Sequence, residues 1–178
     1  MSVVRTFAVL AVATSLSVTA ARAQSAPTDF RDEAMRHFAQ SSDKVVQLAR
    51  AMPEELFSWR PMDGVMPVAQ VYMHIARYNY LYLTNELGLP LPPHIDMDTM
   101  EEVTTKAKVT AMLEESVEFV NNHLAAMHES DVTAMTVQYG RDVAGWVVLF
   151  QLVAHMNEHV GQSIAYARMN HIVPPWSR

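Results

Sequence analysis

The sequence predicts an all-α protein, an antiparallel four-helix bundle. Three observations lead to this fold class. The 178 residues include only five glycines, and strand-like alternation of apolar and polar residues is scarce. Long segments instead repeat apolar residues at intervals of three and four, which is the period of an amphipathic helix. Short or proline-marked connectors separate these segments, as is typical of helices that pack around one core.

The first two predicted helices have recognisable ends. The first covers residues 29–52, and Asp29 is its expected N-cap because a carboxylate accepts hydrogen bonds from free backbone N–H groups. Pro53 ends it, since the proline ring removes a donor and clashes with the preceding turn. The second covers residues 67–87 and begins with proline, which is favoured at a first helical position.

The last two predicted helices differ in their surfaces. The third covers residues 104–128 and has one apolar face, as in an amphipathic bundle helix. The fourth covers residues 142–170, and no charged residue occurs between Val143 and Met156. A helix that is apolar all round is covered on more than one side. We therefore expect a homodimer, with a face of the fourth or the second helix at its interface.

The first 23 residues are predicted to form a secretory signal peptide. Arg5 precedes an apolar run at residues 7–18, and a small-residue cleavage site follows at residues 21–23. The run is too short to span a bilayer, which requires about 20 apolar residues. We therefore expect cleavage before Gln24 and one exported domain, residues 24–178, which is periplasmic or secreted and has no stable membrane anchor.

The charge and the cysteine count exclude several functions. The net charge is −6, and it becomes −8 when the two arginines of the signal peptide are removed. Nucleic acid is therefore not an expected partner, because its backbone requires a basic surface. The chain has no cysteine, which excludes disulfides, thiolate nucleophiles and cysteine-ligated zinc. A metal would have to be held by His, Asp or Glu.

Three histidines form a candidate metal site. His155 and His159 are four residues apart, so they share one face of a helix and lie close enough to share an ion. His74 lies on the inward stripe of the second helix. A buried imidazole without a partner costs about 1–3 kcal/mol, and one metal ion would satisfy all three. The alternative is that they are ordinary core residues hydrogen-bonded to tyrosines or to the backbone.

Three further residues are expected close to this site. Residues 155–159 match H-x-x-E-H, an inverted zinc-peptidase signature, but none of the 19 residues after His159 is the required carboxylate. The peptidase interpretation therefore fails, and Glu158 is expected to be a neighbour of the metal ligands. Gln162 and Tyr78 lie on the same helix faces as the histidines, so they are expected to orient a ligand or line the site. Core packing is the alternative for both.

Three segments resemble the DinB-like (DinB/YfiT) metalloprotein superfamily. They are the connector at residues 51–61, the segment at residues 70–76 around His74, and the C-terminal pattern H-x-x-x-H-x-G-Q followed by I-V-P-P at residues 155–175. The resemblance implies a four-helix bundle, often a homodimer, with a divalent metal on His74, His155 and His159. The chain has His171 where the family usually has glycine, which concerns the end of the last helix.

The expected chemistry follows from three neutral nitrogen ligands, which leave open positions on a divalent ion, as in catalytic sites. Characterised relatives include thiol-dependent transferases and isomerases, but exported proteins do not meet a reduced thiol pool. We therefore expect a metal-dependent hydrolase or transferase acting on a small molecule. The alternatives are a non-catalytic metal- or ligand-binding bundle of the cell envelope and a bundle that keeps the histidines for packing. Zinc or nickel is the expected metal, and iron or manganese is also compatible with imidazole.

Overall fold

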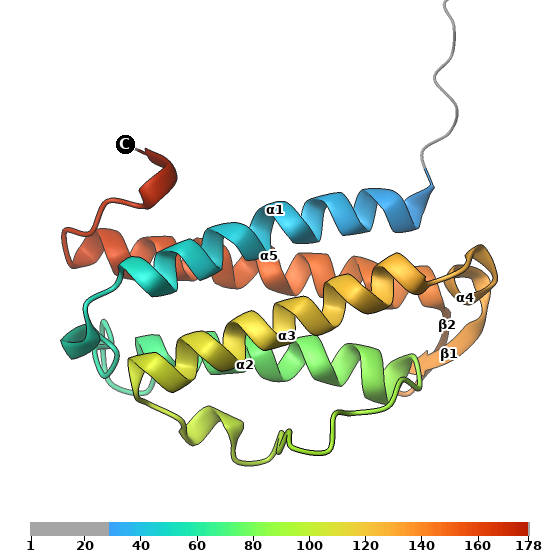
Figure 1. Ribbon diagram of the computed structural model, residues 1–178, viewed down its shortest axis with the longest axis horizontal. Helices are drawn as coiled ribbons and strands as arrows, with labels where there is room; N and C mark the ends of the chain where they lie inside the picture. The colour runs from blue at the N-terminus through green and yellow to red at the C-terminus, as the bar shows by residue number, and fades with distance from the viewer. Residues whose placement is uncertain (1–28, 178) are drawn as a thin grey trace, which may run out of the picture.

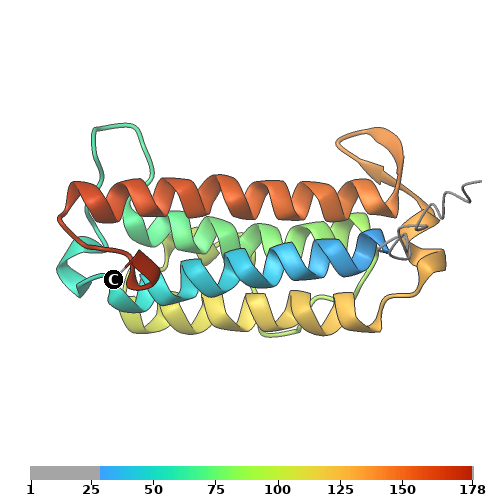
Figure 2. The ribbon, with the colours of Figure 1, turned by 90° about the horizontal axis from the view of Figure 1, so that it is seen from above.

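Four long helices form the body of the protein: α1 (Phe30–Ala51), α2 (Val68–Leu81), α3 (Lys106–Ala126) and α5 (Gly145–Met169). The computed structural model describes residues 29–177, so the predicted signal peptide and its cleavage site lie outside the described residues. In Figure 1, α1 and α5 lie above α2 and α3, and Figure 2 shows all four axes running along the same long direction. The predicted helical bundle is confirmed.

The direction of one helix differs from the simple antiparallel order. Figure 1 shows that α1 and α5 run one way and that α2 and α3 run the other way. Consecutive helices are therefore antiparallel except for α2 and α3. Residues 87–105 connect these two helices, and they return along the length of the bundle below α3. Since an extended chain covers about 3.3 Å per residue, this connector is long enough to make the return.

Neighbouring helices pack through an apolar core with a few polar contacts across it. The Ser41 hydroxyl of α1 donates to Asn157 of α5 at 2.8 Å, and the Asn79 amide of α2 donates to Ser116 of α3 at 3.0 Å. All four helices contribute fully buried apolar side chains, among them Phe38, Leu48, Tyr72, Ile75, Leu113, Val120, Leu149 and Leu152. Burial of this apolar surface is the main stabilising term of such a bundle.

The helix ends agree with the sequence to within a few residues. The carboxylate of Asp29 accepts the N–H of Arg31 at 3.0 Å, as expected for an N-cap. Pro67 is the N-cap of α2 and not its first residue. The second helix continues past α2 as a π-helical segment, η2 (Tyr82–Glu86). Short 3-10 turns lie at η1 (Glu54–Leu56), η3 (Met100–Glu102) and η4 (Pro175–Ser177).

A short helix and a β-hairpin connect α3 to α5, and neither is predicted from the sequence. They are α4 (Glu129–Thr133), β1 (Met135–Gln138) and β2 (Arg141–Ala144). The strands pair antiparallel and are joined by Tyr139 and Gly140, both with positive φ, which is the two-residue turn that matches strand twist. The fourth helix therefore starts at Gly145, three residues later than expected. Each strand has only four residues, and the turn has tyrosine at the position where asparagine is usual, so the sequence signal is weak.

Gly145 allows α5 to begin directly against α4. Its N–H donates to the carbonyl of Ala134 at 2.9 Å, and a Cβ at this position would lie 2.4 Å from the carbonyl oxygen of Asp131. A larger residue would push the two helices apart.

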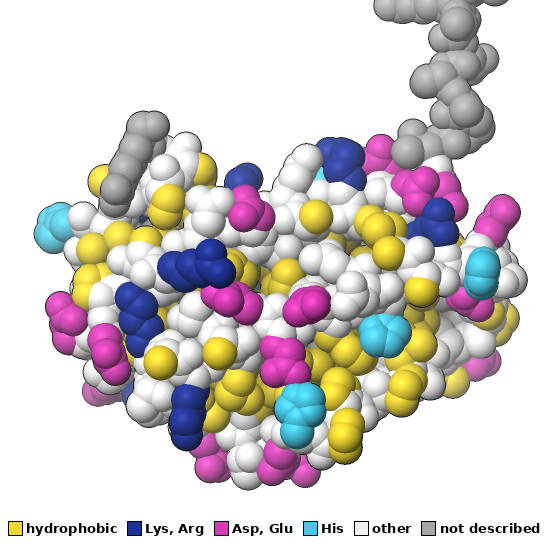
Figure 3. Space-filling model, in the orientation of Figure 1, with side chains coloured by type: hydrophobic (Ala, Val, Ile, Leu, Met, Phe, Trp, Pro, Cys, Tyr) yellow, Lys and Arg dark blue, Asp and Glu magenta, His cyan; other side chains and the backbone are white. Residues whose placement is uncertain are grey.

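The surface of the described residues is mixed in character. On the face shown in Figure 3, acidic and basic side chains lie over α1 and much of α3, whereas apolar side chains gather at the lower right, between α3 and the connector to α2. Among the helices of residues 29–177, none has the length and apolar character needed to cross a membrane.

The last long helix ends in a Schellman motif. The N–H of His171 donates to the carbonyl of Arg168 at 3.0 Å, and the N–H of Ile172 donates to the carbonyl of Ala167 at 2.9 Å. His171 adopts φ 60° and its side chain is exposed. It is therefore the helix-terminating residue that the sequence predicts, in a conformation that glycine adopts without steric cost.

Replacing His171 with glycine should stabilise the protein. A residue with a Cβ is destabilised by about 1 kcal/mol or more in the left-handed region. Glycine removes this cost, but its greater flexibility in the unfolded chain offsets part of the gain in stability. We expect His171→Gly to raise the melting temperature by about 2 °C, measured by calorimetry. His171→Ala is the matched control, because alanine keeps the strained Cβ and should give no gain.

Candidate metal centre

The three predicted ligands meet between two helices that are remote in sequence. His74 lies in the middle of α2, and His155 and His159 lie one turn apart on α5. One ring nitrogen of each histidine lies within 4.8 Å of the others. The ring centroids are 4.5–5.2 Å apart. The antiparallel packing of α2 against α5 is what brings these residues together.

The spacing of the nitrogens suits a shared metal ion. The Nε2 atoms of His155 and His159 are 3.2 Å apart. Two nitrogens bound to one tetrahedral zinc, each at about 2.0–2.1 Å, are separated by about 3.3 Å. The same distance also permits a hydrogen bond between the two rings, but that bond would leave the nitrogen of His74 without a partner in the cluster. The residues fit a three-histidine site for a divalent metal ion.

Glu101 orients the imidazole of His74. The Nδ1 atom of His74 is 2.9 Å from Oε1 of Glu101, on η3. The second carboxylate oxygen accepts from the Gln70 amide at 3.2 Å. Because a carboxylate only accepts, Nδ1 carries the proton and Nε2 keeps the lone pair that a metal needs. A carboxylate behind a metal-binding histidine also raises the basicity of the ligand.

A chain of hydrogen bonds orients His159 in the same way. The Tyr166 hydroxyl donates to the carbonyl of Met66 at 3.1 Å, so it accepts from the Gln162 amide group at 3.2 Å. The carbonyl oxygen of Gln162 therefore faces Nδ1 of His159, at 2.7 Å, and accepts its proton. The lone pair of His159 is again on Nε2. The structure thus places Gln162 directly against a candidate ligand.

Burial keeps two of the imidazoles neutral. His155 is 8% exposed and His159 is 6% exposed, and the side chain of His74 is 20% exposed. Burial, with a smaller effect from the neighbouring histidines, lowers the pKa of His155 to about 3. Burial also lowers the pKa of His159, against the opposing hydrogen bond to Gln162. Both side chains are therefore neutral near pH 7, which is the state that binds metal.

Tyrosines cover one side of the histidine cluster. The ring of Tyr78 stacks on His155 at 4.6 Å and also contacts His74 at 4.5 Å. Tyr82 presents its edge to His155 at 5.7 Å. The hydroxyl of Tyr82 is 3.1 Å from that of Tyr139, at the tip of the β-hairpin, and accepts from the Gln151 amide at 3.4 Å. The hairpin therefore reaches the aromatic wall of the cluster.

Glu158 and Glu101 show where the sequence reasoning was incomplete. Glu158 is exposed, and its effect on His159 is through its charge, which raises the pKa of that group. The carboxylate that bonds a candidate ligand is Glu101, which the sequence analysis did not identify. Glu101 lies in the connector before α3, where no helical period relates its position to the histidines. The remaining described histidines lie outside the cluster; they are His37, His94, His123, His128 and His171.

Comparison with known proteins assigns the family. The family model of the DinB superfamily matches residues 37–167, a segment that contains all three histidines. The chain belongs to the DinB superfamily. It is a DinB-like protein with a three-histidine cluster that is compatible with a metal ion.

Solved structures with the same fold come from several bacteria. A DinB-like protein from Bacillus cereus ATCC 10987 superposes with a TM-score of 0.70 at 16% identity, over 81% of this chain and 95% of that chain. A conserved protein from Enterococcus faecalis gives 0.60 at 16% identity, with 77% and 94% covered. An uncharacterised protein from Escherichia coli UTI89 gives 0.61 at 15% identity, with 80% and 95% covered. A search of curated proteins gave no match. At these identities the structural likeness establishes the fold.

Metal removal should destabilise the native protein. Binding to the native state alone stabilises it by about 4 kcal/mol at a thousandfold excess over Kd. We expect a chelator to lower the melting temperature by several degrees and His74→Ala to abolish most of that shift. The shift should persist at pH 6 and weaken only at more acidic pH, because the lowered pKa values of His155 and His159 keep both imidazoles free of competing protons at pH 6. Elemental analysis and thermal melts with and without chelator measure both effects.

His37→Ala is the control for this experiment, because His37 is exposed on α1 and lies outside the cluster. It should bind metal as the unmodified protein does. If His74→Ala and His155→Ala both retain one equivalent of tightly bound metal, the three-histidine site is wrong.

Glu101 should contribute to metal affinity without touching the ion. Loss of a hydrogen-bond partner behind a metal-binding histidine typically costs about 10–100-fold in affinity, so we expect Glu101→Ala to raise the Kd for zinc by at least about tenfold. Competition with a chromophoric chelator measures this Kd. The adjacent Glu102 is exposed, so Glu102→Ala is the matched control. Equal Kd values for the two variants would refute the role of Glu101.

Proposed function

We propose that this protein is a metal-dependent enzyme, a hydrolase or transferase that acts on a small molecule. The observation that carries the proposal is the number of candidate ligands. Among residues 29–177 the cluster contains three histidines and no fourth His, Asp or Glu, while Glu101 faces the opposite nitrogen of His74. Structural zinc sites usually take four protein ligands, whereas catalytic sites keep a position for water or substrate.

A divalent ion held by these histidines would act as a Lewis acid and would lower the pKa of a water molecule bound to it to about 7. The residues of the chain then have separate tasks. Glu101 and Gln162 hold two imidazoles in the orientation that binds metal. Tyr78 and Tyr82 cover one side with aromatic surface and exclude water there. His74 is the most exposed of the three ligands, which favours approach of a substrate from its side.

Hydrolysis is the more favoured of the two reaction classes. The chain contains no cysteine, so it supplies no thiolate nucleophile. A transferase of the thiol-dependent kind needs a reduced thiol, which an exported protein would not meet. Export itself is part of this proposal and is supported by the pattern of residues 1–23. Mass spectrometry of the native protein tests it, with Gln24 as the expected first residue.

A non-catalytic metal-binding bundle is the second candidate. The observations that favour it are the burial of His155 and His159 and the stacking of Tyr78 on His155, since a buried ion with restricted access can serve for binding alone. Both candidate functions require a bound metal ion, but only the enzyme converts a substrate.

The test is turnover by protein purified without affinity metals. Zinc- and nickel-loaded samples are assayed with p-nitrophenyl acetate and p-nitrophenyl phosphate, beside the chelated protein, His74→Ala and His37→Ala. We expect hydrolysis only in the loaded protein and in His37→Ala, with kcat rising near pH 7. Stoichiometric metal without turnover above the chelated control would contradict hydrolysis and favour the binding bundle.

We also propose that the protein is a homodimer. The support is the group of aromatic side chains on α1 and α5 that the described chain leaves exposed. Trp146 is 45% exposed and Phe150 is 59% exposed, one turn apart on α5, and the ring of Phe30 packs edge-on against Trp146 at 5.6 Å. Exposed apolar patches of this kind mark interaction surfaces. Light scattering at micromolar protein concentration measures the molecular mass, and we expect the mass of two chains. The mass of one chain would contradict the proposal.

A further inference from the structure

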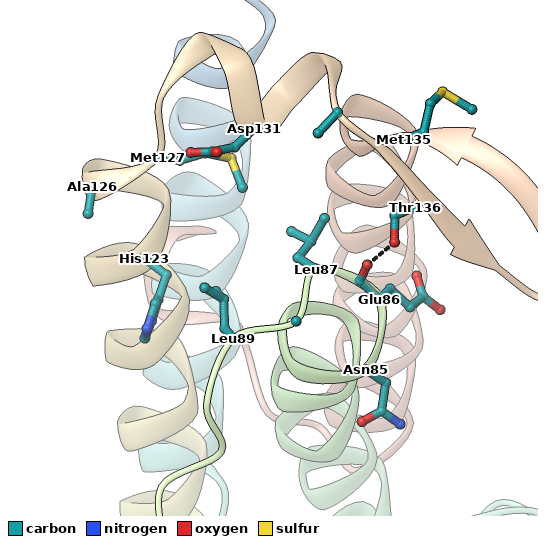
Figure 4. A pocket seen from close by; sticks show the side chains of 12 residues that line it. Asn85, Glu86, Leu87, Leu89, His123, Ala126, Met127, Asp131, Met135 and Thr136 are labelled. Carbon is teal, nitrogen blue, oxygen red and sulfur yellow. Dashed lines mark hydrogen bonds between the residues drawn. The ribbon is translucent and has the colours of Figure 1, made fainter.

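A cavity lies at the hairpin end of the bundle, apart from the histidine cluster. It has a volume of about 530 Å³ and is lined by the end of η2, the end of α3 and the α4–β1 segment (Figure 4). Small-molecule sites typically measure about 300–1,000 Å³. Asn85 is the first residue in the chain that lines the cavity. It follows His74 by eleven residues, which corresponds to about 16 Å along a helix. No residue of the histidine cluster lines the cavity.

Apolar side chains from three segments form most of the cavity wall. Leu87 and Leu89 lie on one side, Met127 at the end of α3 lies opposite, and Met135 of β1 lies at the hairpin (Figure 4). Methionine side chains are flexible and polarizable, so they adapt to ligands of different shape. The wall is suited to an apolar ligand body.

The charged side chains that line the cavity, Asp131 and Glu86, are acidic, and Asn85 adds an amide group. One oxygen of Asp131 accepts from the backbone N–H of His128 at 2.8 Å, and the other oxygen has no hydrogen-bond partner among residues 29–177. The helix formed by α2 and η2 also ends at the cavity, and a helix C-terminus carries partial negative charge.

His123 adds a further acceptor. Its Nδ1 donates to the carbonyl of Phe119 at 2.7 Å, so in the neutral ring Nε2 keeps its lone pair. The ring lies near Leu89 in Figure 4. No Lys or Arg is among the described residues that line the cavity. Arg31 reaches the carbonyl of Met127, but it does not line the cavity and is paired with Asp29 and Asp32.

We propose that this cavity binds a small organic cation, an amine whose apolar body packs on the leucines and methionines and whose ammonium group faces Asp131. An ammonium group is a hydrogen-bond donor only, which matches the free oxygen of Asp131 and the lone pair on Nε2 of His123. The apolar surface adds affinity that an inorganic cation would not gain. The site is independent of the metal centre and requires no metal.

The probe for this proposal is hexylammonium, compared with hexanoate, which has the same apolar length and the opposite charge. Both are titrated into the full-length, metal-loaded protein with ¹³C-labelled methionine methyl groups. Met127 is 8% exposed and reports on the cavity, and the exposed Met62 and Met169 report on non-specific contacts. We expect a saturable shift of Met127 with hexylammonium, and binding of hexanoate that is weaker by about tenfold.

Two variants test the ligand contacts. Asp131→Asn keeps an oxygen for the N–H of His128, so α4 retains its cap, and it should weaken hexylammonium binding by about tenfold. Leu89→Lys places a cation in the cavity and should also weaken it. Asp142→Asn is the matched control, because Asp142 is an exposed residue of the same hairpin that does not line the cavity. Equal binding of both probes, equal shifts at Met62, or unchanged affinity in both variants would overturn the proposal.

Discussion

The convergence of three imidazoles between α2 and α5 is the constraint on which the functional part of the structure depends. His155 and His159 are almost fully buried, and buried polar groups are costly unless they are paired. Their neutral state follows from that burial, which lowers the pKa of both groups. A cluster of neutral, closely spaced nitrogens is well suited to a divalent cation. The rest of the bundle, with its apolar core, holds the two helices at the separation that this cluster requires.

The connectors determine how the cluster is oriented. His74 is held by Glu101, which lies in the long return connector between α2 and α3. His159 is held through Gln162 and Tyr166, whose hydroxyl donates to the carbonyl of Met66, just before α2. In both cases an acceptor on Nδ1 places the lone pair on the nitrogen that faces the cluster. The packing of the helices therefore brings the histidines together, and the hydrogen bonds of Glu101 in the connector and of Gln162 on α5 select the nitrogen that is free to bind.

The hairpin between α3 and α5 links the two candidate sites in space. Gln138 of β1 donates to the buried carboxylate of Glu86 at 2.7 Å, and Thr136 donates to the carbonyl of Glu86. Burial raises the pKa of Glu86, while the bond from Gln138 lowers it. Tyr139 at the turn meets Tyr82 in the aromatic wall of the histidine cluster. One side of this small element thus borders the cavity at the hairpin end, and its tip reaches the tyrosines that cover the histidine cluster.

Local patterns in the sequence determined the helices, their caps and the ligand candidates. The three-and-four period placed four long helices, Asp29 and His171 marked ends, and the inward positions of His74, His155 and His159 followed from helix geometry alone. Only the tertiary structure decided that α2 and α3 run in the same direction, that a hairpin precedes α5, and that Glu101 bonds His74. The physical reason is that helical periodicity is a local property. The path of a connector and the partner of a loop carboxylate depend on contacts between residues far apart in the chain.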